Sequence, residues 1–127
     1  DVAGAGGTSW SQVEMYRISD PHLANVAHAF KDWGIPTSES ILNVKKVNPS
    51  AIVFASGGLR SGIDIAKGIA LGAALGGMAG YFLKAAMVSS EALVQLINQI
   101  KREIQVSMFA VGAKTIDQLQ HTPLVKD

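Results

Sequence analysis

The sequence predicts an α/β protein with a parallel sheet, and three observations support this prediction. Two continuous apolar runs, Ala51–Ala55 and Ala73–Ala79, each lead into a glycine-containing turn and then into a helical pattern. A continuous apolar run is typical of a strand that is buried on both faces. The composition, with 48% hydrophobic and 17% charged residues, indicates extensive buried surface. Strands that alternate with helices in this order are typical of a parallel α/β fold.

The first quarter of the chain combines a glycine loop with one clear helical pattern. Asp1–Gly4 resembles the end of a buried strand with nothing ahead of it to begin that strand, so we expect a truncated beginning. It leads into the glycine-rich loop Gly4–Thr8, and the polar segment that follows gives weak local signals. Pro21–Trp33 has apolar residues at helical spacing, with Asp20 as the predicted cap and Gly34 as the predicted end. Within this helix Trp33 is expected to lie in the core.

The remaining elements follow from the same signals. Thr37 is predicted to cap a short helix whose Ile41, Leu42 and Val44 point inward. Ala51–Ala55 and Ala73–Ala79 are the two predicted buried strands. Further helices are expected over Ser61–Leu71, from Gly80 or Tyr81 onward, over Ser90–Val111, and from a Thr115 cap to about Gln120.

Composition excludes several classes of function. A net charge of +1, without a basic run or an aromatic-interleaved stripe, gives no support for nucleic-acid binding. The absence of Cys excludes disulfides and thiolate metal sites, and it fits a cytoplasmic location. The three His residues are dispersed and show no metal-ligand spacing, so we expect no metal site within this chain.

A membrane-spanning helix is the alternative for one stretch of the chain. An uncharged run of 16 residues between Lys67 and Lys84 contains glycines at every fourth position. Such a stripe of small residues is found where transmembrane helices pack together. The run is shorter than the roughly 20 residues that a span needs. We therefore expect no membrane partner.

The strongest chemical signal is the segment Ser56–Gly62, which joins a predicted strand to a helix. Its glycines allow the backbone to approach an anion closely, and the N–H groups of the following helix are expected to point at it. Arg60 adds a charged fork that matches phosphate oxygens. Ala79-Gly80 occupies the same strand-to-helix position one repeat later. Two tight turns without a ligand are the alternative, but the pair of loops favours phosphate binding.

These residues resemble a known family. The motifs Ala55–Arg60, Asp64–Lys67, Ile69–Ala73 and Gly77–Gly80 are similar to the final repeats of FMN-dependent barrel enzymes. Inosine-monophosphate dehydrogenases fit less well because they need a nucleophilic Cys, and 2-hydroxyacid oxidases because a His-Gly-Gly-Arg motif is absent. The family of type 2 isopentenyl-diphosphate isomerases fits best, through Gly4–Trp10 with Glu14, Asp32–Thr37 and Gly112–Thr115.

The resemblance implies a fold and a set of site residues. The fold would be the C-terminal part, about strands 6–8 with their helices, of a TIM (β/α)8 barrel, and residues 1–127 would form one FMN-binding domain that lacks the N-terminal half. Thr8 would contact FMN. Gly58, Leu59 and Arg60 would bind the FMN phosphate, together with the backbone of Ala79 and Gly80.

Trp10 and Glu14 are the catalytic residues that the resemblance implies, facing the isoprenoid substrate. Moving a proton on an allylic carbon needs a positioned carboxyl in a water-poor pocket. An indole face can shield an apolar tail and stabilise developing positive charge. From the residues alone, Trp10 could instead be a lid aromatic and Glu14 a solvated carboxylate.

The activity that the resemblance implies is the interconversion of isopentenyl diphosphate and dimethylallyl diphosphate. It would use reduced FMN, Mg²⁺ and a reductant such as NADPH, with the Mg²⁺ and diphosphate ligands outside this chain. The family implies a homo-oligomer, a tetramer or an octamer, and this chain alone would be inactive. Two alternatives stay open: another FMN-dependent barrel oxidoreductase, and a non-catalytic half-barrel that binds phosphate.

Overall fold

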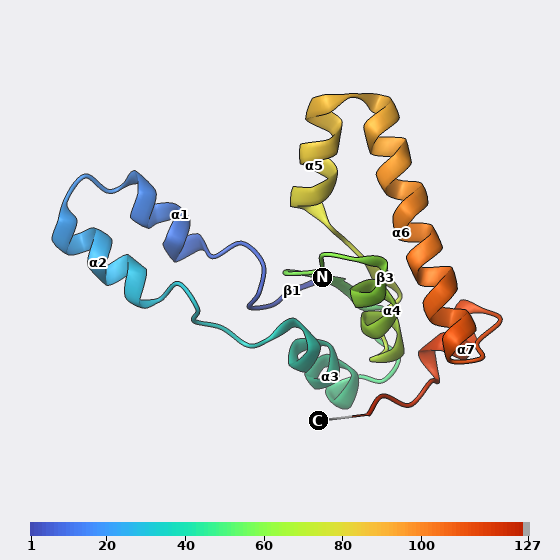
Figure 1. Ribbon diagram of the computed structural model, residues 1–127. Helices are drawn as coiled ribbons and strands as arrows, with labels where there is room; N and C mark the ends of the chain where they lie inside the picture. The colour runs from blue at the N-terminus through green and yellow to red at the C-terminus, as the bar shows by residue number, and fades with distance from the viewer. Residues whose placement is uncertain (126–127) are drawn as a thin grey trace.

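A computed structural model describes residues 1–125, in which helices flank a small parallel sheet (Figure 1). The strands are β1 (Val2–Ala3), β2 (Phe54–Ser56) and β3 (Leu75–Gly76), in the order β1-β2-β3. In both pairs the strands are parallel, with Val2 opposite Ala55 and Ala55 opposite Gly76. Parallel neighbours require crossover connections, which the helices provide. The predicted parallel α/β arrangement is confirmed.

All but the first of the described helices fall close to the predicted ranges, and the first lies in the polar segment that gave only weak local signals. They are α1 (Trp10–Arg17), α2 (Pro21–Ala29), α3 (Thr37–Val47), α4 (Gly62–Ala70), α5 (Ala79–Val88), α6 (Ser90–Ala110) and α7 (Ile116–Gln120). The long helix α6 runs beside α5 in an upright hairpin, whereas α1 and α2 form a second hairpin that extends away from the sheet (Figure 1). No helix within residues 1–125 combines the length and the apolar character that crossing a membrane would require.

The core consists of two hydrophobic clusters. Ile41 of α3 packs with Val53, Ala55 and Ala73 against the sheet. The second cluster joins α4, α6 and α7 to the residue before α5, through Ile65, Ala66, Ile69, Met78, Ile100 and Leu119. Helices α4 and α6 cross closely at Gly62. A Cβ atom on Gly62 would lie 2.5 Å from the Ile100 carbonyl oxygen, so no side chain fits there.

The prediction that both apolar runs are buried on two faces is wrong. Val53 and Ala55 are buried, whereas Ile52 and Phe54 are 77% and 46% exposed. Leu75 of β3 is also exposed. Helices cover one face of the sheet in the described chain, so alternate strand residues are left bare on the other face.

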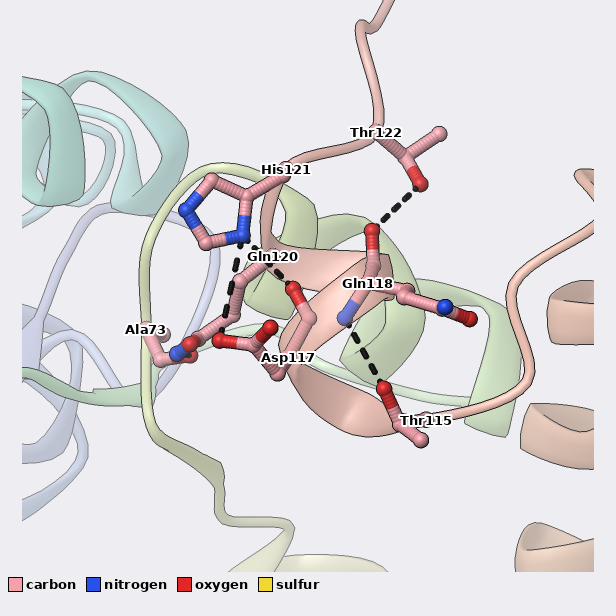
Figure 2. Close-up of polar contacts among 7 residues, drawn as sticks. All are labelled: Ala73, Thr115, Asp117, Gln118, Gln120, His121 and Thr122. Atoms are coloured by element: carbon pink, nitrogen blue, oxygen red, sulfur yellow. Dashed lines mark hydrogen bonds and ion pairs between the residues drawn. The ribbon is translucent and has the colours of Figure 1, made fainter.

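Two of the three predicted helix caps are confirmed. The Asp20 carboxylate accepts from the His22 N–H at 2.8 Å at the start of α2. Thr115 Oγ1 accepts from the Gln118 N–H at 3.2 Å at the start of α7, as Figure 2 shows. The Gln120 amide then donates to the Ala73 carbonyl at 3.0 Å and ties α7 to the turn before β3 (Figure 2).

Three predictions about single residues are wrong. Leu42 of α3, which was expected to point inward, is 38% exposed. Helix α2 ends at Ala29, and Trp33 is 81% exposed, with its ring edge-on to Phe30 at 5.8 Å, because no element of the described chain covers it. Thr37 does not cap α3. It is the first residue of that helix, Pro36 occupies the cap position, and no side chain caps the helix there. The buried hydroxyl of Thr37 bonds elsewhere.

Candidate functional site

Three glycine-rich loops line a cavity of about 430 Å³ at the carboxyl ends of the strands. Because β1, β2 and β3 are parallel, the loops that follow them meet at the same edge of the sheet. The end of β2 and the loop after it, residues 56–60, line this cavity together with residues 77–81 after β3. Seven of the eight predicted site residues line it: Thr8, Trp10, Gly58, Leu59, Arg60, Ala79 and Gly80.

The walls of the cavity carry backbone N–H groups without protein partners. Within residues 1–125, the N–H groups of Gly58 and Leu59 donate to no protein acceptor. Helix α5 begins after Met78 without a side-chain cap, so the N–H groups of its first turn are also free. Unpaired N–H groups at a helix start carry partial positive charge and attract anions.

Helix α4 is arranged in the opposite way, and here the expectation that its N–H groups point at an anion is wrong. The Gly62 N–H donates to the Glu103 carboxylate, and the Asp64 N–H donates to the Ser61 hydroxyl. The Arg60 N–H donates to the Asp64 carboxylate at 2.9 Å. Carboxylates of the protein itself therefore occupy the start of α4. The N–H groups that remain available to an anion are those of the loop after β2 and of the start of α5.

Glycine backbones press the first two loops together. Gly57 and Gly58 have φ values of 85° and 84°, which side chains rarely adopt. A Cβ atom on Gly57 would lie 2.6 Å from the Gly4 carbonyl oxygen, and one on Gly58 would lie 2.5 Å from that of Gly6. No side chain fits between the loops, so the position of one fixes the position of the other.

Arg60 supplies the positive charge of the site. Its side chain is exposed at the cavity, and its guanidinium forms no ion pair within the described chain. The nearby Asp64 carboxylate bonds to the backbone N–H of Arg60 and to the Ser61 hydroxyl. The guanidinium is therefore available for a bidentate contact with phosphate oxygens.

Trp10 and Glu14 are placed differently by α1. Trp10 is 78% exposed and lines the cavity. Glu14 lies outside it, and its carboxylate is 3.5 Å from the Arg17 guanidinium on the same exposed face. The structure thus brings the indole, but not the carboxylate, to the candidate site.

A second hollow of about 910 Å³ adjoins the first. Both are lined by Gly6, Thr8, Trp10 and Arg60, and the hollow continues to the aromatic pair Phe30 and Trp33. Together the two spaces have unpaired backbone N–H groups and Arg60 at one end, and the aromatic side chains of Phe30 and Trp33 at the other.

Sequence reasoning missed two residues that shape the site. Thr37 Oγ1 lies 2.6 Å from the Gly57 carbonyl oxygen, and the Glu103 carboxylate holds the start of α4. No local signal pairs residues so distant in sequence. In the described part of the chain, no three His, Cys, Asp or Glu side chains gather where they could hold a metal ion.

Comparisons with known proteins show what this chain is similar to in sequence. A family model described as FMN-dependent dehydrogenase matches residues 32–126. Isopentenyl-diphosphate delta-isomerases match 98% of the chain at 44% identity in Oceanobacillus iheyensis, 46% in Rickettsia bellii and 47% in Synechocystis. The match covers 36% of each relative, so the chain spans about a third of their length.

The fold also matches a solved structure. A crystal structure described as a lactate oxidase of Pediococcus acidilactici superposes with a TM-score of 0.63 at 22% identity. The superposition covers 82% of this chain and 33% of the other. At this identity the likeness concerns the fold alone.

Proposed function

Since this chain belongs to the FMN-dependent dehydrogenase family, we propose that its cavity holds the phosphate of FMN. The observation that carries the proposal is the set of unpaired N–H groups, from Gly58, Leu59 and the start of α5, around one space that also contains Arg60. A phosphate ester has three terminal oxygens, which accept hydrogen bonds from backbone N–H groups and from a guanidinium. The adjoining hollow past Thr8 and Trp10 offers room for the flavin ring.

The proposed activity is the interconversion of isopentenyl diphosphate and dimethylallyl diphosphate. It is supported by the identity of 44–47% to relatives that carry the isomerase name. When bound, reduced FMN would supply acid–base chemistry next to the migrating double bond. The Trp10 indole would cover the apolar tail, and Glu14 would move a proton on the substrate after turning from Arg17 toward the cavity.

The remaining requirements of this activity would be met by residues outside this chain. We propose that Mg²⁺ and the diphosphate are bound there, and that NADPH keeps the flavin reduced. The bare sheet face around Ile52, Phe54 and Leu75 would then face the interior of a barrel, of which this chain forms about strands 6–8. On the same proposal the complete enzyme is a cytoplasmic homo-oligomer, and this chain alone is inactive.

The deciding experiment uses the full-length protein, as its gene encodes it, with isopentenyl diphosphate and photoreduced FMN. We expect dimethylallyl diphosphate to form without net oxidation of the flavin. NMR of the methyl groups would measure the product. The second candidate is an FMN-dependent oxidoreductase, which the family description and the fold neighbour favour. Reoxidation of the flavin by an organic acceptor, with no isomerised product, would decide for that candidate.

A further inference from the structure

We propose that Thr37 is a positioning residue, whose hydroxyl sets the direction of the loop N–H groups that receive the phosphate. This inference rests on the proposed function of the cavity. Thr37 does not line the cavity itself, and it acts through the peptide between Gly57 and Gly58.

The contact between Thr37 and the loop is short and shielded. Thr37 is 8% exposed, and it is the buried polar residue of the described chain. Its Oγ1 lies 2.6 Å from the Gly57 carbonyl oxygen and 3.1 Å from that of Ser56. A hydroxyl has one proton to donate, so the shorter contact with Gly57 is the principal hydrogen bond.

Planarity of the peptide transmits this bond to the cavity. The bond between Gly57 and Gly58 is trans, so the Gly57 carbonyl and the Gly58 N–H point in opposite directions in one plane. Holding the carbonyl toward Thr37 therefore turns the Gly58 N–H away from Thr37. That N–H has no acceptor within residues 1–125, and Gly58 lines the cavity.

Rotation of this peptide is the motion that the loop must resist. Gly57 and Gly58 lack side chains, and glycine adopts many backbone angles at low cost. A rotated peptide would present the Gly57 carbonyl oxygen, instead of an N–H group, to an anion. The Thr37 hydrogen bond opposes that rotation from behind the loop.

The start of α3 shows that the hydroxyl serves the loop and not its own helix. A Thr at a helix start usually caps the first turn. Here Pro36 takes the cap position and no side chain caps α3. Thr37 is brought to β2 by Gly4, where a Cβ atom would lie 2.5 Å from the Thr37 Cα. Departures from local rules of this kind are characteristic of functional sites.

The test compares FMN with riboflavin, which lacks the phosphate, by fluorescence titration of the full-length protein. In Thr37→Val, the FMN dissociation constant should rise roughly five- to tenfold, the value of about one hydrogen bond, while that of riboflavin stays unchanged. Thr37→Ser should restore FMN binding. Ser38→Ala is the matched control, because it removes an exposed hydroxyl of α3 that lines neither the cavity nor the adjoining hollow.

The possible results separate this inference from the proposed function. Equal losses of FMN and riboflavin affinity in Thr37→Val, or a lowered Tm with both affinities intact, would make Thr37 merely structural and overturn the inference alone. A wild-type protein that binds FMN no better than riboflavin would overturn the phosphate site and the inference with it. If Thr37→Val does not fold, Thr37→Ala takes its place, because it leaves room for a water molecule. Its dissociation constants for FMN and for riboflavin are then compared in the same way.

Discussion

Gly7 and Gly57 lie in direct backbone contact: a Cβ atom on Gly7 would come within 2.5 Å of the Gly57 Cα. The two residues belong to loops that follow neighbouring parallel strands, and 49 residues separate them in the sequence. Nothing wider than a glycine backbone fits at this junction. The loop after β1 is therefore part of the wall that supports the candidate phosphate loop.

Gly7→Ala should separate these loops. The added methyl group meets backbone atoms, which cannot turn aside as a side chain can, so we expect the unfolding free energy to fall by about 1–3 kcal/mol. Denaturant titration of the purified protein measures this change. Gly80→Ala is the matched control, because a Cβ atom there meets nothing within 4 Å and should not lower stability. Equal stability of Gly7→Ala and the wild type would contradict the contact.

Arg60→Ala should weaken FMN binding without destabilising the fold. The guanidinium makes no ion pair within the described chain, so its removal breaks no structural contact. A charge-assisted hydrogen bond to phosphate is worth about 1.5–3 kcal/mol, which corresponds to roughly a 10- to 150-fold rise in the FMN dissociation constant. Arg102→Ala, on the exposed face of α6, is the control. An unchanged FMN dissociation constant would remove Arg60 from the site.

Glu14→Gln tests the chemical part of the proposed function. The amide keeps the shape of the carboxyl but cannot exchange a proton at neutral pH, so turnover of isopentenyl diphosphate in the full-length protein should fall by about 10²–10⁴-fold. FMN affinity should stay the same, because Glu14 lies outside the cavity. Arg17→Ala controls for loss of the exposed ion pair. Near-normal turnover in Glu14→Gln would make Glu14 a solvated carboxylate.

Glu103→Gln should change how stability depends on pH. Hydrogen bonds from the Gln99 amide, and then from the Gly62 N–H, lower the pKa of the Glu103 carboxyl below its ordinary value of 4.5. A lowered pKa means that the charged form is stabilised by folding. This contribution is fully present above pH 4.5, and it is lost as the pH falls through the depressed value.

We therefore expect Glu103→Gln to unfold at a lower temperature than the wild type at pH 7, and the difference to shrink as the pH is lowered below 4.5. Calorimetry across this range measures both curves. Glu39→Gln is the control, since that carboxylate of α3 accepts no side-chain hydrogen bond within residues 1–125. A difference that stays constant with pH would rule out the charged carboxylate as the cause.

Local signals in the sequence were sufficient for the order of the elements other than α1, and for most of the cavity. Asp20 and Thr115 cap the helices where their positions predict, because capping involves neighbours two or three residues away. The glycine loops meet because parallel strands bring their carboxyl ends together. These are consequences of short-range geometry and of strand direction.

Other features depend on partners that no local pattern specifies. The Thr37 hydroxyl reaches a carbonyl 20 residues away, and the Glu103 carboxylate reaches an N–H 41 residues away. The exposure of Trp33 and Ile52 depends on what covers them, and an apolar side chain alone does not say whether a covering element is present. Glu14 was expected at the site but faces Arg17, because α1 places it on the exposed side.

The hairpin of α1 and α2 has a consequence for amide hydrogen exchange. Neither helix contains a buried residue, and both extend away from the sheet (Figure 1). Segments with few buried contacts open at a lower free energy than the whole molecule, so their amide protons exchange with solvent first. The amides of α4, which lie between the sheet and α6, should exchange only on global unfolding. If a bound ligand draws this hairpin over the cavity, amide exchange should slow first in α1, around Trp10 and Glu14, before any change elsewhere.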